Sequence, residues 1–139
     1  MKAYFFALLT AGIWGFVPLL EKYAFRHPID PLLAVTIRSL GITICFFFLL
    51  FFKWGIHPIL QVETSSLIAL MVAGILAAVI GYTAFYHALK AGAVSIVTPL
   101  SATYPLVTYI LGVYFFHEAV TLPRLAGVGL VLAGILLLK

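Results

Sequence analysis

Five long apolar stretches, separated by short polar connections, make up most of this 139-residue chain. A helix needs about 20 mostly apolar residues to cross the hydrocarbon core of a bilayer. The pattern therefore predicts an all-α integral membrane protein, a five-transmembrane-helix bundle. Because the connections are short, consecutive helices should be antiparallel neighbours within one domain, residues 1–139. The predicted helices cover residues 4–24, 31–52, 64–89, 94–116 and 122–138.

Composition strengthens this prediction and narrows the function. Hydrophobic residues form 65% of the chain and charged residues 9%, whereas a soluble domain carries about 25% charged residues. Apart from Arg38, the basic residues stand singly at helix ends, without the basic face that nucleic-acid binding needs. No Ser/His/Asp arrangement, metal-ligand pair or phosphate-binding glycine loop is visible. We therefore expect no enzyme, no catalytic residue, no metal, no cofactor and no nucleic-acid partner.

Lys and Arg are divided almost evenly between the two ends of the predicted bundle. Short-loop Lys/Arg bias sets the orientation of a membrane protein, so this division gives almost no preference. Two interpretations stay open: the chain inserts both ways up and pairs with an inverted copy, or it inserts one way with a weak signal. An inverted dimer would reproduce a ten-helix inverted-repeat transporter architecture, of which one chain is half. Alternating crossings place Lys2, Lys53 and Arg124 on one side, and Lys22, Arg26, Lys90 and Lys139 on the other.

Arg38 is the most informative single residue, because it lies inside the second predicted helix. It follows Pro31 by seven residues, about 10 Å along the helix axis. An arginine at mid-bilayer costs at least about 2.5 kcal/mol, so it usually faces a cavity or a partner. Its guanidinium fork suits a substrate carboxylate or phosphate. Alternatively, it snorkels to the nearby interface or pairs with Asp30 or Glu21.

The fourth predicted helix combines a polar face with two prolines, Pro99 and Pro105. Spacings of three and four residues place five polar or small residues on one helix face. A proline inside a membrane helix frees a carbonyl, which protein or water in a cavity can satisfy. The pattern favours a flexible, cavity-lining helix, although the hydroxyls can also bond carbonyls of their own helix. The face consists of Thr98, Ser101, Tyr104, Thr108 and Gly112.

Aromatic residues in two other helices complete the candidate site. Tyr82, Tyr86 and His87 lie toward the end of the third predicted helix, as a substrate wall or as an interfacial belt. Trp14, in the middle of the first helix, is harder to explain as a belt residue. No acidic residue is expected at membrane depth, because Glu21 and Glu118 fall at helix ends. The predicted substrate-binding residues are Arg38, Trp14, Tyr82, Ser101, Tyr104 and Thr108.

Taken in order, several of these positions resemble the EamA-like domain of the drug/metabolite transporter superfamily, over essentially the full chain. The resemblance covers the paired Trp14-Gly15, the opening of the second helix, the turn after the third helix and the glycines of the last helix. The matching residues are Trp14, Gly15, Pro31, Arg38, Ala88, Leu89, Ala91, Ala93, Ser95, Pro105, Glu118, Gly127 and Gly134.

The resemblance implies a carrier of small metabolites that works by alternating access, commonly as an exporter of amino acids or related compounds. The usual family member has two such domains, whereas this chain has one. We therefore expect an antiparallel homodimer, or a related five-helix partner, in the cytoplasmic membrane of a prokaryote. Two other functions remain open: a non-transporting membrane subunit, and a component of a lipid-linked-sugar flippase. A membrane-embedded enzyme ranks last.

Overall fold

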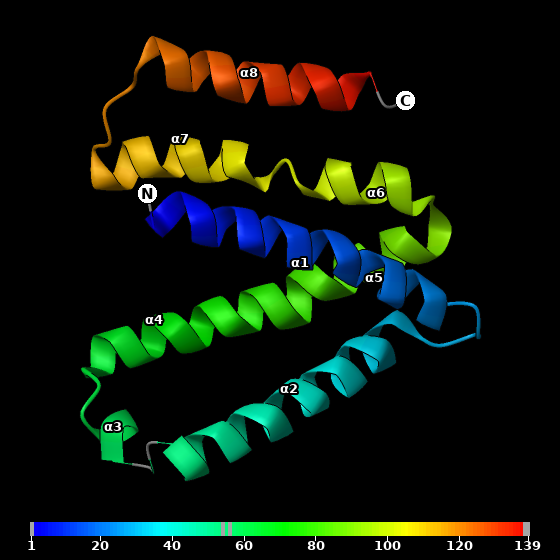
Figure 1. Ribbon diagram of the computed structural model, residues 1–139, viewed down its shortest axis with the longest axis vertical. Helices are drawn as coiled ribbons and strands as arrows, with labels where there is room; N and C mark the ends of the chain where they lie inside the picture. The colour runs from blue at the N-terminus through cyan, green and yellow to red at the C-terminus, as the bar shows by residue number, and fades with distance from the viewer. Residues whose placement is uncertain (1, 54, 56, 138–139) are drawn as a thin grey trace. The chain divides into compact units, whose positions relative to one another are not determined.

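The described chain is helical, as the sequence predicts. The computed structural model describes residues 2–53, 55 and 57–137 (Figure 1). Its elements are α1 (Lys2–Ala24), α2 (Pro31–Lys53), α3 (His57–Leu60), α4 (Thr64–Ile75), the π-helix η1 (Leu76–Gly81), α5 (Tyr82–Ala91), α6 (Val94–Ser101), α7 (Tyr104–Phe116) and α8 (Leu122–Leu136). The short helix α3 was not expected; it lies in the connection between the second and third predicted helices.

Four helical segments are long and apolar enough to cross a membrane. They are Tyr4–Ala24, Pro31–Lys53, Thr64–Ala91 and Val94–Phe116. The third combines α4, η1 and α5, and the fourth combines α6 and α7. The last helix, α8, is apolar but has 15 residues, fewer than the roughly 20 of an ordinary crossing. The fifth crossing therefore stays a prediction.

The chain divides into two compact units. Unit 1 comprises Met1–Lys22 and Ala91–Lys139, and unit 2 comprises Tyr23–Lys90. Unit 1 thus holds most of α1 together with α6, α7 and α8, whereas unit 2 holds α2 to α5. The two units are described separately below.

In unit 2, α2 and the third crossing pack together where η1 meets α2. Asp30 starts α2, because its Oδ1 accepts hydrogen bonds from the backbone N–H groups of Leu32 (2.9 Å) and Leu33 (3.2 Å). Such a cap satisfies N–H groups that have no partner within the helix. Lys90, at the end of the third crossing, donates to the carbonyl of Ile29 at 3.0 Å. The loop before α2 is thereby held at both α2 and α5.

In unit 1, the fourth predicted helix is broken between its two prolines rather than at either of them. Pro99 lies inside α6, which continues to Ser101, and the chain turns at residues 102–103. Pro105 lies in the first turn of α7, where a missing N–H costs no helix bond. The predicted polar face is therefore divided between two helices. Lys22 of α1 donates to the carbonyl of Gly92 at 2.8 Å, near the start of α6.

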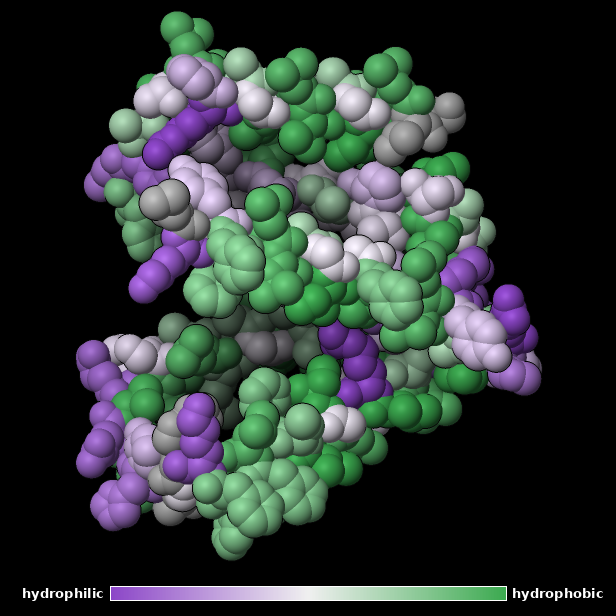
Figure 2. All heavy atoms as spheres, viewed as in Figure 1, coloured by the Kyte–Doolittle hydropathy of each residue, from purple (hydrophilic) through white to green (hydrophobic). Residues whose placement is uncertain are grey.

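The helix surfaces are those of a protein in lipid. Among the described residues, the buried apolar side chains are Val35, Tyr86, Leu89 and Val97, together with the prolines Pro18 and Pro31. Large apolar side chains elsewhere are exposed, such as Phe52 (79%). On the face in Figure 2, apolar residues cover most of the helices and polar residues gather mainly at helix ends. A water-soluble protein does not leave such continuous apolar surface uncovered, which supports a multi-pass membrane protein.

Candidate functional site

Arg38 and Tyr82 form the best-defined contact among the predicted site residues, and both belong to unit 2. The guanidinium carbon of Arg38 lies 3.9 Å from the centre of the Tyr82 ring. Both side chains are partly buried. A cation over an aromatic face is stabilised by about 0.5–2 kcal/mol, more as water is excluded. The contact therefore stabilises a positive charge at helix depth.

Three local features place these two side chains. The Asp30 cap fixes the start of α2, two turns before Arg38. Tyr82 is the first residue of α5, directly after the π-helix that packs against α2. Tyr82 also meets the ring of Tyr86, with centroids 5.8 Å apart and nearly perpendicular planes. Edge-to-face rings favour each other by about 0.5–1.5 kcal/mol, so the Tyr82 ring is held from two directions.

Tyr86 extends this contact into a buried aromatic cluster. It is 3% exposed, and its ring lies 5.3 Å from that of Phe25. An interfacial belt residue is exposed to lipid head groups, so that interpretation is wrong for Tyr86. His87 is exposed, which is compatible with an interfacial position. Tyr82 thus connects Arg38 to the cluster formed by Tyr86 and Phe25.

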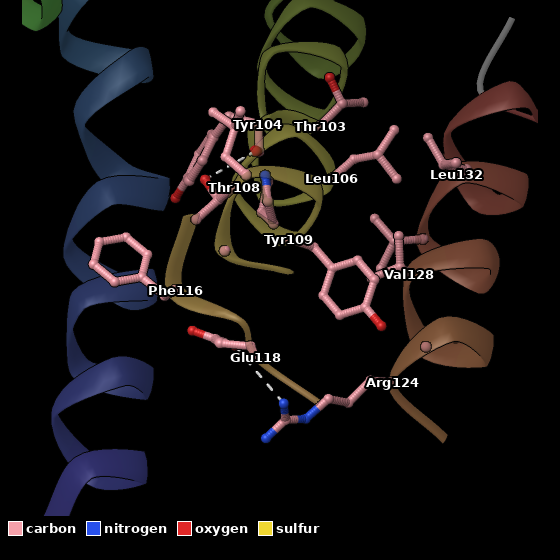
Figure 3. Close-up of a pocket in the computed structure, with 15 residues that line it drawn as sticks. Thr103, Tyr104, Leu106, Thr108, Tyr109, Phe116, Glu118, Arg124, Val128 and Leu132 are labelled. Carbon is pink, nitrogen blue, oxygen red and sulfur yellow. Dashed lines mark hydrogen bonds and ion pairs between the residues drawn. The ribbon is translucent and has the colours of Figure 1, made fainter. Parts of the chain in front are cut away.

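Unit 1 contains a groove of about 700 Å³ between α7 and α8 (Figure 3). Two predicted site residues, Tyr104 and Thr108, line it. The Thr108 hydroxyl donates to the carbonyl of Tyr104 at 3.2 Å, so this hydroxyl bonds its own helix as the alternative interpretation expected. The volume lies within the 300–1,000 Å³ range of small-molecule sites. The helix α8 supplies Arg124, Gly127, Val128, Val131 and Leu132 to this groove.

Charged and polar groups lie at defined points of the groove. At one end, Glu118 and Arg124 approach to 3.7 Å, each with a side chain 56% exposed, and Figure 3 shows the pair facing each other. Further in, the Tyr109 hydroxyl is buried, with no hydrogen-bond partner in the described structure. The ring of Tyr109 points toward Val128 of α8 (Figure 3). Burying an unpaired hydroxyl costs about 1–3 kcal/mol, so a hydrogen bond from a bound molecule to this atom would be stabilising.

Sequence reasoning did not select the Glu118–Arg124 pair or Tyr109. Opposite charges on either side of a short helix connection could have indicated the pair. Sequence reasoning placed Glu21 near the end of the first helix, which is confirmed, but it did not predict that this side chain is buried. Glu21 lies within α1, three residues before its end, and is 9% exposed. The chain therefore does carry a buried carboxyl group, and groups of this kind at membrane depth are commonly functional.

The six predicted residues do not share one cluster in the described structure. Arg38 and Tyr82 meet in unit 2, and Tyr104 and Thr108 line the groove of unit 1. Trp14 lies in α1 with 60% of its surface exposed. Ser101 ends α6 and is exposed. Trp14 and Ser101 are not among the described residues that line the groove. Their substrate roles stay predictions.

Groups able to hold a metal ion are absent from the described residues, where no three His, Cys, Asp or Glu side chains come together.

Comparison with known proteins assigns the family. The sequence is 33% identical over 133 residues to an uncharacterised protein of Methanocaldococcus jannaschii, a match that covers 95% of this chain and 92% of the relative. No solved structure matches the chain. The description of the matching family is "EamA-like transporter family", and the match extends over residues 1–139. The apolar helices, the arginine inside α2 and this match lead to one conclusion: the chain belongs to the EamA-like transporter family.

Proposed function

We propose that this protein exports small metabolites, such as amino acids or related compounds, by alternating access. The working form is an antiparallel dimer of two copies, each contributing five crossings, in the cytoplasmic membrane of a prokaryote. Arg38 binds the carboxylate of the substrate. The family match supports a transporter, and the observation that carries the residue assignment is the partly buried guanidinium of Arg38 against Tyr82.

Two observations support Arg38 as the substrate anchor. Its position on α2 removes it from bulk water, where a charge-assisted bond to a carboxylate is stronger. Its guanidinium is planar and always charged, and one face lies on an aromatic ring. A flat, permanently charged group of this kind binds carboxylates in a fixed orientation. An amino acid substrate would present a carboxylate to it.

Dimerisation is supported by charge. The nearly equal numbers of Lys and Arg at the two ends permit both orientations. Two oppositely oriented copies would give the inverted repeat found in many transporters.

The proposal is tested with purified protein in vesicles loaded with a panel of radiolabelled amino acids. Replacing Arg38 by alanine should lower efflux by about tenfold or more, which corresponds to about 1.4 kcal/mol of lost binding. Arg38→Lys should restore little of the efflux, because an ammonium group lacks the planar fork. Unchanged efflux in Arg38→Ala would remove Arg38 from the substrate site.

Arg26→Ala is the matched control. The guanidinium of Arg26 also lies over a tyrosine, 4.6 Å from the ring centre of Tyr23, but Arg26 is exposed in the turn that follows α1. Its loss should leave efflux unchanged. A reporter at the C-terminus tests the dimer separately: signal from both sides of the membrane supports inverted pairing, and signal from one side requires a different partner.

The groove between α7 and α8 favours a second candidate, a component of a lipid-linked-sugar flippase. That function needs a largely apolar groove beside the lipid, and the groove of unit 1 is lined mostly by apolar side chains. Transfer of a fluorescent isoprenoid-linked sugar between leaflets, with no efflux of any amino acid, would favour this candidate. Efflux without lipid transfer would exclude it.

A further inference from the structure

The third crossing contains an irregularity at its midpoint. Between α4 and α5 the six residues of η1 form a π-helix, which ends at Gly81, directly before Tyr82. A π-helix bonds residue i to i+5, so it holds one more residue per turn than an α-helix. Such bulges occur often at functional sites. Here the bulge adjoins the residue that covers Arg38.

The extra residue decides which side chain faces Arg38. Successive residues in an α-helix are rotated by about 100°. Because η1 holds one residue more, Tyr82 occupies the position that Gly81 would occupy if α4 continued without interruption. The observed register puts the Tyr82 ring 3.9 Å from the guanidinium carbon. The uninterrupted register would put a residue with no side chain there.

We propose that the extra residue moves one turn along the helix, from before Tyr82 to after it, and that Gly81 then replaces Tyr82 over Arg38. This movement takes the ring off the guanidinium face, so that the N–H fork at the edge of the guanidinium can turn toward a substrate carboxylate. Only the turn between the old and new bulge changes register, so Tyr86 and Leu89, which are 3% and 0% exposed, keep their places. The inference rests on the proposed function in one respect, the role of Arg38 as substrate anchor.

Two observations at the moving turn support this register exchange. The Thr83 hydroxyl is buried in the observed register, with no hydrogen-bond partner in the described structure. An unpaired buried hydroxyl destabilises that register and brings the alternative closer in free energy. Gly81 is the second observation. A Cβ atom there would meet the carbonyl oxygen of Leu76 at 3.4 Å, the short limit of an ordinary van der Waals contact.

Gly81 therefore does not need to be glycine in the observed register. Its backbone has no positive φ, unlike that of Gly55, and the available space would accept an alanine. Glycine weakens a helix relative to alanine, so the residue carries a cost that the observed register does not explain. The shifted register explains it, because only glycine leaves the guanidinium face uncovered.

Deletion of Ala78 tests the exchange directly. It removes the extra residue from η1, so the crossing should become continuous α-helix with Tyr82 held permanently over Arg38. Phenylglyoxal, which modifies arginine, is the probe, and mass spectrometry of the full-length protein in detergent reads each site. The three arginines of the chain are Arg26, Arg38 and Arg124, so the other two serve as internal references. Modification of Arg38 should slow several-fold relative to both.

A substitution gives the second arm. Gly81→Leu keeps the residue count but puts a side chain over Arg38 in the shifted register, so Arg38 modification should again slow several-fold. Gly74→Leu is its control, because Gly74 also lies on this crossing and a Cβ there meets nothing within 4 Å. Deleting Gln61, in the connection before α4, controls for the loss of one residue. Circular dichroism checks that each variant keeps its helix content.

The results separate this inference from the proposed function. An unchanged or faster Arg38 reaction in either the Ala78 deletion or Gly81→Leu, with helix content retained, overturns the register exchange. Slower reaction in both variants and unchanged reaction in both controls supports it. If that pattern appears while Arg38→Ala still exports the substrate, the register exchange stands and the proposed role of Arg38 fails. If Arg38→Ala stops export while the deletion leaves the reaction unchanged, the reverse holds.

Discussion

In unit 2, Tyr86 and Leu89 are buried and the ring of Tyr86 meets that of Phe25, whereas α7 and α8 of unit 1 leave a groove of about 700 Å³ between them. Both regions carry a positively charged residue beside a tyrosine-containing surface. In unit 2 Arg38 is partly buried on a ring, and in unit 1 Arg124 pairs with Glu118 at the exposed end of the groove. The difference indicates that the part of unit 2 around Tyr86 and Leu89 is a fixed support, whereas the groove of unit 1 is a surface with contacts still to make.

The largest difference in stability between the two units should appear when a leucine side chain of each is shortened to alanine. Leu89→Ala should lower the free energy of unfolding by about 2 kcal/mol, the low end of the range for buried leucines, because lipid offers the unfolded helices an equally apolar environment. Leu136→Ala, at an α8 position 67% exposed, should change it by less than about 0.5 kcal/mol. Unfolding by sodium dodecyl sulfate in mixed micelles, followed by circular dichroism, measures both. Equal losses would mean that unit 2 has no tighter packing.

In a second test, the substitution in unit 1 should raise stability rather than lower it. Tyr109→Phe removes the buried hydroxyl that has no partner in the groove, so stability of the isolated chain should rise by about 1 kcal/mol. Tyr82→Phe keeps the ring that faces Arg38 and should leave stability nearly unchanged, as measured by the same unfolding titration. A loss of stability in Tyr109→Phe would show that the hydroxyl already has a partner in the membrane.

The third comparison concerns the first residues of two helices, where we expect a change in stability of similar size. Asp30→Ala should cost about 1 kcal/mol, because it removes the side-chain cap of α2. Thr121 stands at the same position before α8 but makes no side-chain cap hydrogen bond, so Thr121→Ala should have almost no effect. Thermal unfolding of the two variants side by side makes the comparison. A larger loss in Thr121→Ala would contradict the view that unit 1 is the less constrained region.

The smallest effect concerns the Glu118–Arg124 pair. Both side chains are 56% exposed, and exposed ion pairs contribute about 0–1 kcal/mol. Glu118→Gln should lower stability by a few tenths of a kcal/mol in low salt, and by less when the salt concentration is raised. Unfolding titrations at two salt concentrations measure this dependence. A salt-independent loss above about 1 kcal/mol would mean that the pair is more deeply buried in the membrane than in the described structure.

The sequence predicted the long helices well because the length of an apolar run sets a membrane crossing directly. It could not predict η1, since an extra residue in Leu76–Gly81 leaves the apolar composition unchanged. It indicated an interruption of the fourth helix near Pro99 and Pro105, and the helix is interrupted between them, at residues 102–103, although α6 continues through Pro99 itself. A proline marks a weak point, and packing decides where the helix ends.

Of the candidate site, single residues could be selected but their partners could not. Arg38 stands out because a charge inside an apolar run is costly. Its contact with Tyr82, 44 residues later in the chain, depends on the helical register that η1 sets. Glu21 was placed correctly near the end of α1, but its burial could not be predicted from the hydrophobic pattern. Which side chains meet across two helices depends on how each helix is rotated about its axis, and the hydrophobic pattern does not determine this rotation.

The brevity of α8 has a consequence for the membrane itself. Its 15 residues span about 22 Å at 1.5 Å per residue, several ångströms less than the roughly 30 Å of an average hydrocarbon core. Lipids beside a short crossing must compress, at a fraction of a kcal/mol per ångström of mismatch. If α8 crosses the membrane, the protein should therefore favour bilayers of short acyl chains. In that case the thickness of the host membrane itself would govern how firmly α8 is inserted.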